Sequence, residues 1–177
     1  MKNTIYAQVE SLTRKHGTRD PFALLDALGA VTQFSDRYAS DGLKGFCMIL
    51  NRTRYVVINS KLSPEDQRVT AAHELGHLVM HGSELRCGAF RDSDIYQPQN
   101  RWEREANFYG ADLLIRDSDV LELMREGNAN FFTVAGALRV PCEFFAFKLY
   151  SMIERGLPMR MPVELDSNFL AGKRKTK

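Results

Sequence analysis

The pentapeptide HELGH at residues 73–77 contains the residue types that hold a metal ion and activate a water molecule on it. His73 and His77 project from one helical face, because four residues advance the side chain by only about 40° beyond a full turn. Both imidazoles can therefore bind one ion, while Glu74 can reach a water on that ion without binding the metal. This pattern is typical of zinc hydrolases in which the glutamate acts as general base. The non-functional alternative is a surface helix with two unrelated histidines.

A catalytic zinc site takes three protein ligands and leaves one position for water, so a third ligand must come from elsewhere in the chain. His81 lies on the same helical face, but eight residues of helix separate its backbone from that of His73 by about 12 Å. A histidine at position 83 would complete a different zinc motif, but that residue is Ser83. We therefore interpret His81 as a helix-terminal residue favoured by the helix dipole.

The stretch EREAN, on a later predicted helix, offers two glutamates. Glu103 and Asn107 are four residues apart on one face, so Glu103 can bind the ion while Asn107 hydrogen-bonds a ligating histidine. Glu105 is expected to point elsewhere, towards Tyr109 and Asp112. We predict Glu103 as the third ligand and keep Glu105 as the alternative. Without the upstream motif, both glutamates would be interpreted as part of a solvated face.

The elements that position these residues are also indicated by the sequence. Ser63 and Pro64 begin the helix that carries the motif, because serine caps a helix and proline fits its first turn. Gly82 is expected to end this helix after residue 81, and the helix with the third ligand begins near Arg101. Further helices are expected at 3–15, 21–28, 118–126, 131–138 and 143–155, and strands at 31–34, 45–50 and 55–59, the last two joined as a hairpin.

These elements predict an α+β fold, with a small three-stranded, mostly antiparallel sheet packed on a zincin-like helical core and a helical C-terminal part. The predicted division is a core over 1–116, a C-terminal helical subdomain over 117–157 packed on that core, and an extended basic tail over 158–177. No helix or strand is expected over 83–100. A connection of that length beside a metal site is more often functional than idle.

The composition is that of an ordinary soluble protein, with 177 residues, 44% hydrophobic and 26% charged. A net charge of +2 is too small to imply nucleic-acid or membrane binding. No stretch approaches the roughly 18 apolar residues of a membrane span, and the first ten residues lack the apolar run of a signal peptide. Cys47, Cys87 and Cys142 include no CxxC pair, which indicates reduced thiols in a cytoplasmic protein.

The blocks HELGHLVMH and EREANFYGADLLI resemble the ImmA/IrrE family of bacterial and phage metallopeptidases. The similarity covers most of residues 5–150. It implies a gluzincin-like site in which His73 and His77 are ligands, Glu74 is the catalytic glutamate and Glu103 is the third ligand. Two departures affect the helix with the third ligand: Ile115-Arg116 stands where the family often has Met-Pro, and Tyr109 where it usually has alanine.

The resemblance also implies an activity and a partner. The chain is expected to be a metalloendopeptidase with one Zn²⁺ ion, although two histidines and a glutamate also suit other divalent metals such as manganese. Its expected substrate is a helix-turn-helix transcriptional repressor encoded nearby in a prophage or other mobile element. Tyr96, Tyr109 and His81 are candidate donors to the oxyanion, and an extended substrate could add as a strand to residues 45–50.

The competing interpretation is a non-catalytic, metal-binding regulator that antagonises a repressor or binds DNA through its C-terminal helices. Residues 132–149 loosely resemble a helix-turn-helix, but the second helix offers Lys148 and few other side chains for bases and phosphates. We therefore expect a protein partner and no direct nucleic-acid binding. The two classes differ in whether a bound repressor is cut or only released.

Overall fold

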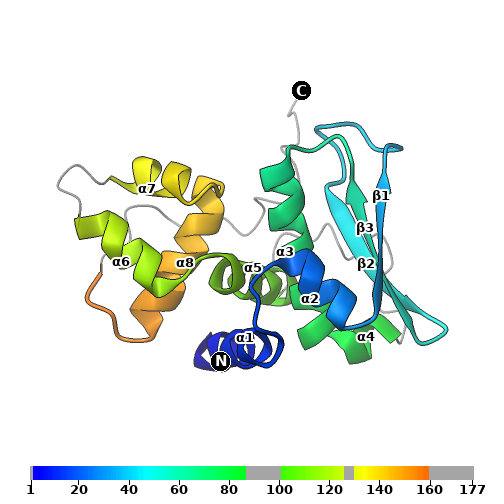
Figure 1. Ribbon diagram of the computed structural model, residues 1–177, viewed down its shortest axis with the longest axis horizontal. Coiled ribbons are helices and arrows are strands. Elements are labelled where there is room, and N and C mark those ends of the chain that lie inside the picture. The colour runs from blue at the N-terminus through cyan, green and yellow to red at the C-terminus, as the bar shows by residue number, and fades with distance from the viewer. Residues whose placement is uncertain (1, 87–100, 126–129, 160–177) are drawn as a thin grey trace.

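The computed structural model describes residues 2–86, 101–125 and 130–159, and these ranges contain eight helices and three strands. The expected α+β class is therefore confirmed (Figure 1). In chain order the elements are α1 (Lys2–His16), α2 (Pro21–Ala27), β1 (Ala30–Ser35), β2 (Gly45–Leu50), β3 (Thr53–Asn59), α3 (Pro64–Met80), α4 (Gly82–Arg86), α5 (Arg101–Leu114), α6 (Asp117–Arg125), α7 (Phe131–Ala137) and α8 (Cys142–Glu154).

The sheet has the strand order β1-β3-β2 and is mixed. The predicted hairpin between β2 and β3 is present, with Asn51 and Arg52 in the left-handed region that a two-residue hairpin turn requires. Because β3 returns between the two earlier strands, it pairs in parallel with β1 and antiparallel with β2. The sheet therefore differs from the mostly antiparallel one that was expected, in the direction of the β1–β3 pair.

Capping explains where the motif helix begins, and a short helix that the sequence did not predict follows its end. The Ser63 side chain accepts a hydrogen bond from the Asp66 backbone, as expected for the N-cap of α3. His81 is the C-cap, but Gly82 does not adopt the left-handed conformation of a helix-stopping glycine. Gly82 instead begins α4, so the prediction of a connection without helix from residue 83 was wrong for residues 83–86.

Two glycines allow α3 and α5 to pack at close range. A Cβ on Gly76 of α3 would lie 3.1 Å from the Cα of Ala106, and one on Gly110 of α5 would lie 3.2 Å from the backbone nitrogen of His73. Both distances are shorter than ordinary packing contacts, so a side chain at either position would push the helices apart. The helix that carries the motif and the helix that carries the predicted third ligand therefore lie backbone to backbone.

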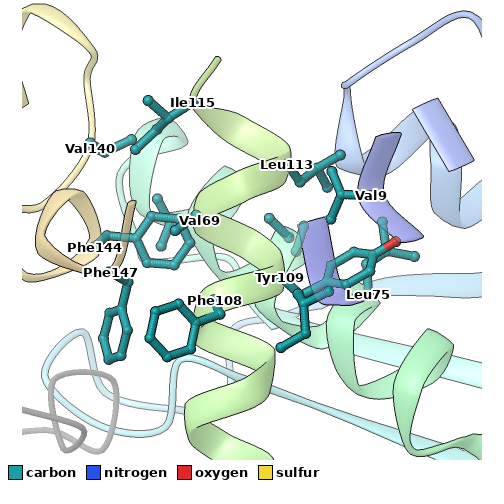
Figure 2. Close-up of a cluster of buried hydrophobic side chains, with 14 of the residues drawn as sticks. Val9, Val69, Leu75, Phe108, Tyr109, Leu113, Ile115, Val140, Phe144 and Phe147 are labelled. Carbon is teal, nitrogen blue, oxygen red and sulfur yellow. The ribbon is translucent and has the colours of Figure 1, made fainter. Parts of the chain in front are cut away.

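Apolar side chains from four helices fill the core around α5 (Figure 2). Val9 of α1 lies beside Leu113 of α5, and Phe144 and Phe147 of α8 lie on the opposite side of α5 near Phe108. The rings of Phe108 and Phe147 meet edge to face with centroids 5.2 Å apart. As a result, α5 is buried between the N-terminal helix, the motif helix and the last helix.

A buried ionic network fixes α8 to α5 and α6. Lys148 is completely buried, with its Nζ 2.9 Å from Oδ1 of Asp112 and 2.6 Å from Oδ1 of Asp117. Ser151 donates to the other oxygen of Asp112, and Arg155 donates to both oxygens of Asp117. The predicted division at residue 116 stays a prediction, and the part of the predicted tail beyond residue 159 lies outside the described residues. Among the helices described, none is long and apolar enough to cross a membrane.

Candidate metal centre

Three side chains meet at one point between α3 and α5. His73 Nε2 and His77 Nε2 lie 3.1 Å apart. Each of these nitrogens lies 3.2 Å from a carboxylate oxygen of Glu103, His73 from Oε2 and His77 from Oε1. Within the described ranges these are the residues whose ligand atoms cluster closely enough to hold a metal ion. The structure thus brings together the three residues that the sequence selected as ligands.

The spacing and chemistry of these atoms fit a tetrahedral zinc site. Ligand atoms about 2.1 Å from a tetrahedral ion are about 3.4 Å from one another, close to the distances observed here. Two imidazoles and a carboxylate are also a common ligand set of catalytic zinc, and they leave the fourth position for water. The ligand side chains are shielded, with the two histidines 5% and Glu103 19% exposed.

Asn107 occupies the place predicted for it. Its Oδ1 lies 2.9 Å from Nδ1 of His73, so the imidazole N–H donates there and the lone pair of Nε2 faces His77 and Glu103. Without a cation, that lone pair would face a second imidazole nitrogen and a carboxylate. The amide nitrogen of Asn107 is buried and has no hydrogen-bond partner among the described residues. The surroundings of His73 therefore favour a positive ion at the meeting point.

The pKa shifts of His73 and Glu103 also indicate that positive charge is favoured where the three side chains meet. Burial lowers the pKa of His73, but the hydrogen bond and charge of Glu103 outweigh burial and raise this pKa overall. Burial raises the pKa of Glu103, but its contacts with His73 and His77 are stronger and hold the pKa well below its usual range. Both shifts have the same physical origin, since positive charge between these three side chains is stabilised by the carboxylate.

Glu74 follows His73 on α3 and is buried, 6% exposed. The thiol of Cys47, on β2, is a neighbour of this carboxylate. Burial, followed by the charge of Glu74, raises the pKa of Cys47 well above its ordinary value, so the thiol stays protonated. Sequence reasoning missed Cys47, because nothing in a lone cysteine on a predicted strand indicates which side chain it will face.

His81 and Glu105 differ from expectation. His81 is buried and its ring faces two partners: Nδ1 lies 3.2 Å from Nδ1 of His77, and Nε2 lies 3.1 Å from Oε2 of Glu105. Burial and the charge of His77 lower the pKa of His81, although the hydrogen bond to Glu105 raises it. His81 is the C-cap of α3, so its expected helix-terminal position is confirmed, but its two side-chain partners were not expected. Glu105 also contacts Arg101 and does not point towards Tyr109 and Asp112 as expected. Glu105, the alternative third ligand, is thus hydrogen-bonded to His81.

One other residue named from the sequence, Tyr109, does not lie at the site. Tyr109 is completely buried, and Figure 2 shows its ring in the core beside Leu75 and Val9. Its hydroxyl has no partner, and burial raises its pKa. Tyr109 therefore packs against the motif helix and does not face the meeting point of the ligands. Tyr96 and Cys87 lie outside the described residues.

Comparison with known proteins shows which family the sequence is similar to. The sequence profile of a peptidase family described as "IrrE N-terminal-like domain" matches residues 26–150, which is more than half of the chain. A relative from Bacillus phage phi105, an "uncharacterized immunity region protein 2", is 27% identical over 114 residues. That alignment covers 64% of this chain and 69% of the phage protein. The matched segment contains both the HELGH motif and the EREAN stretch.

Proposed function

The chain belongs to the peptidase family described as the IrrE N-terminal-like domain, and on that premise we propose that it is a zinc-dependent endopeptidase. The observation that carries the proposal is the convergence of His73 Nε2, His77 Nε2 and the Glu103 carboxylate within hydrogen-bonding distance of one another. Three such ligands around one ion, with a glutamate beside the first histidine, are the requirements of a zinc hydrolase.

Each residue has a separate role in the proposed reaction. When bound, zinc acts as a Lewis acid and lowers the pKa of a coordinated water from about 15.7 towards 7. The Glu74 carboxylate would accept a proton from the attacking water and would return it to the leaving amine. The protonated thiol of Cys47 lies beside the Glu74 carboxylate and would favour its charged form. Asn107 keeps His73 in the tautomer that presents Nε2.

The sheet offers a place for the substrate backbone. β2 lies at one edge of the described sheet, because β3 is its partner on the other side. Cys47 of β2 contacts Glu74, so this strand runs beside the proposed general base. A peptide that adds to the free edge of β2 would receive main-chain hydrogen bonds and lie with a carbonyl near the ligands.

The proposed substrate is a helix-turn-helix transcriptional repressor. The printed name of the phage relative places that protein in an immunity region. The resemblance to the ImmA/IrrE family implies that a repressor encoded nearby is cut and repression relieved. On this proposal the chain recognises a protein partner and acts on its backbone.

The C-terminal helices argue against the DNA-binding alternative. Helix α8 contains an uninterrupted buried run from Phe144 to Leu149. Lys148, the one basic side chain in that run, is paired with two aspartates inside the protein. A recognition helix must expose side chains to base edges and phosphates. We therefore assign α8 to the core.

The test uses the full chain, zinc and a purified helix-turn-helix repressor from the same genetic neighbourhood. We expect cleavage products by mass spectrometry with the wild type, and none with Glu74→Gln. The variant must still bind one zinc ion, because Glu74 is proposed as the base and not as a ligand. Metal analysis of wild-type protein purified from cells supplied with both zinc and manganese identifies the ion that is retained.

The outcomes separate the two classes of function. Repressor released from DNA by both the wild type and Glu74→Gln, without cleavage, would support an antagonist that acts by binding. Cleavage by the Glu74→Gln variant at the wild-type rate would contradict the role of Glu74. Failure of the wild type to bind zinc would contradict the metal centre itself.

A further inference from the structure

Polar contacts lead from Nδ1 of His77, through His81 and Glu105, to the surface of the protein. His77 Nδ1 contacts His81 Nδ1 at 3.2 Å, and His81 Nε2 contacts Glu105 Oε2 at 3.1 Å. The other carboxylate oxygen of Glu105 accepts from Nε of Arg101 at 2.7 Å. The rings of His81 and Trp102 lie side by side, with centroids 6.0 Å apart. A continuous chain of polar contacts thus joins His77 to an exposed arginine.

If His77 is a metal ligand, only one arrangement of protons satisfies this chain. A histidine that gives its Nε2 lone pair to a metal must carry its proton on Nδ1. The contact between the two Nδ1 atoms is then a hydrogen bond only if Nδ1 of His81 is the acceptor. The proton of His81 must therefore be on Nε2, where it needs an acceptor of its own. The carboxylate of Glu105 lies at that position.

We propose that His81 and Glu105 are positioning residues that hold His77 in its metal-binding tautomer and ring orientation. The proposal rests on the metal centre described above and extends it to residues that do not touch the ion. His81 supplies the acceptor that His77 needs, and Glu105 fixes the tautomer in which His81 is an acceptor. Arg101 in turn holds Glu105.

The two ligating histidines are therefore oriented in different ways. His73 donates to the neutral amide of Asn107 on α5, one step from the metal. His77 donates to the imidazole of His81, at the end of the same helix. The charge of Glu105 reaches His77 only through this second imidazole. Partners of ligating groups typically contribute a factor of 10 to 100 in metal affinity or activity. His81 and Glu105 can therefore contribute to metal affinity although neither is a ligand.

The experiment measures zinc affinity by competition with a chromophoric chelator, in the full chain and without substrate. His81→Leu removes the acceptor, whereas His81→Asn keeps an oxygen near the position of Nδ1. Glu105→Gln removes the charge that selects the His81 tautomer. Glu84→Gln is the matched control, because Glu84 is a nearby carboxylate on α4 that interacts with His81 through charge alone. Nitrogen-detected NMR of the zinc-loaded protein identifies the protonated nitrogen of each imidazole.

We expect zinc affinity to fall about 10- to 100-fold in His81→Leu, and His81→Asn to recover most of that loss. Glu105→Gln should lower affinity less, about tenfold, and should leave His81 in a mixture of tautomers. Glu84→Gln should stay within about twofold of the wild type, since exposed charges contribute little. The wild-type spectra should show His77 protonated on Nδ1 and His81 on Nε2.

Two results would overturn the proposal while leaving the metal centre intact. One is wild-type zinc affinity in His81→Leu. The other is an equal loss in His81→Leu and His81→Asn, accompanied by equal losses of thermal stability in the metal-free protein, which would indicate packing alone. A wild type that bound no zinc would overturn the proposed metal centre and this extension together.

Discussion

Gly110 of α5 lies against the backbone of His73, so closely that a Cβ at position 110 would be 3.2 Å from the His73 nitrogen and 2.8 Å from Cζ of Phe144. The position of His73, the first proposed metal ligand, is therefore set by the packing of two helices as well as by the helix that carries it. Glu103 projects from α5, two turns before Gly110. The distance between α3 and α5 thus determines whether Glu103 can reach both histidines.

The first prediction concerns this helix contact. Gly110→Ala should destabilise the protein by about 1–3 kcal/mol, because the methyl group overpacks a buried contact, and should weaken zinc binding by displacing Glu103. The matched control is Gly136→Ala in α7, where a Cβ would meet nothing within 4 Å. This control should be neutral or stabilising by up to about 1 kcal/mol, because alanine favours the helix. Urea unfolding and zinc competition measure both effects, and equal behaviour of the two variants would contradict the explanation.

The second prediction separates the two glutamates of the EREAN stretch. Glu103→Ala should lower zinc affinity at least about tenfold more than Glu105→Gln, because a ligand contributes more than a partner of a ligand. The measurement is the zinc content after dialysis against a weak chelator, together with the dissociation constant. Zinc retained by Glu103→Ala but lost from Glu105→Gln would show that the assignment of the third ligand is wrong.

The third prediction concerns the buried lysine. Lys148→Met should destabilise the protein by about 3–5 kcal/mol, because Asp112 and Asp117 would lose a buried positive partner. Adding Asp112→Asn should recover part of this loss, since it removes one of the two charges that lose Lys148 as a partner, whereas Asp117 keeps Arg155. Chemical unfolding of the two single variants and the double variant gives the coupling energy. Strict additivity of the two substitutions would contradict the pairing of Lys148 with Asp112.

The fourth prediction is a pH dependence. Burial raises the pKa of Asp117, but Arg155 and Lys148 outweigh burial and lower it below its ordinary value near 3.8. A carboxylate with a depressed pKa contributes stability that is present above the unfolded value and lost as the pH falls through the folded value. Asp117→Asn should therefore be less stable than the wild type at pH 7, by about 1.5–3 kcal/mol.

The difference between the wild type and Asp117→Asn should shrink as the pH falls below about 4, where the aspartate also becomes neutral. Unfolding curves at pH 7, 5, 4 and 3 measure this convergence. Glu122→Gln, an exposed carboxylate on the same helix, provides the control and should track the wild type at every pH. A difference that stays constant down to pH 3 would exclude Asp117 as the source of the effect.

Much of the proposed centre could be predicted from the sequence, because its spacing is local. His73 and His77 are held four residues apart by one helix, and helical periodicity also put Glu103 and Asn107 on a common face. The cap at Ser63 located the start of α3, and its side chain accepts the expected backbone hydrogen bond. These features depend on one element at a time.

The features that could not be predicted depend on contacts between elements. The contact of His81 with Glu105 joins residues 24 positions apart, and it requires the register between α3 and α5. The eight-residue separation of His73 and His81 argues against His81 as a ligand beside His73, but it does not indicate the contact between His81 and His77. Cys47 meets Glu74 across the boundary between sheet and helix. The parallel pairing of β1 with β3 likewise depends on where the hairpin returns, which local turn signals do not specify.

The burial of Lys148 has a consequence for the order of events during synthesis. A ribosome completes α3 and α5 well before it reaches α8. Until then, Asp112 of α5 lacks Lys148 and Ser151, the partners that stabilise its charge in the folded protein. Until α8 packs there, the carboxylate of Asp112 depends on water for its stabilisation, because a buried charge without partners is unfavourable. The side of α5 that faces α8 should therefore stay hydrated until residue 151 has left the exit tunnel, so α8 joins the fold late in synthesis.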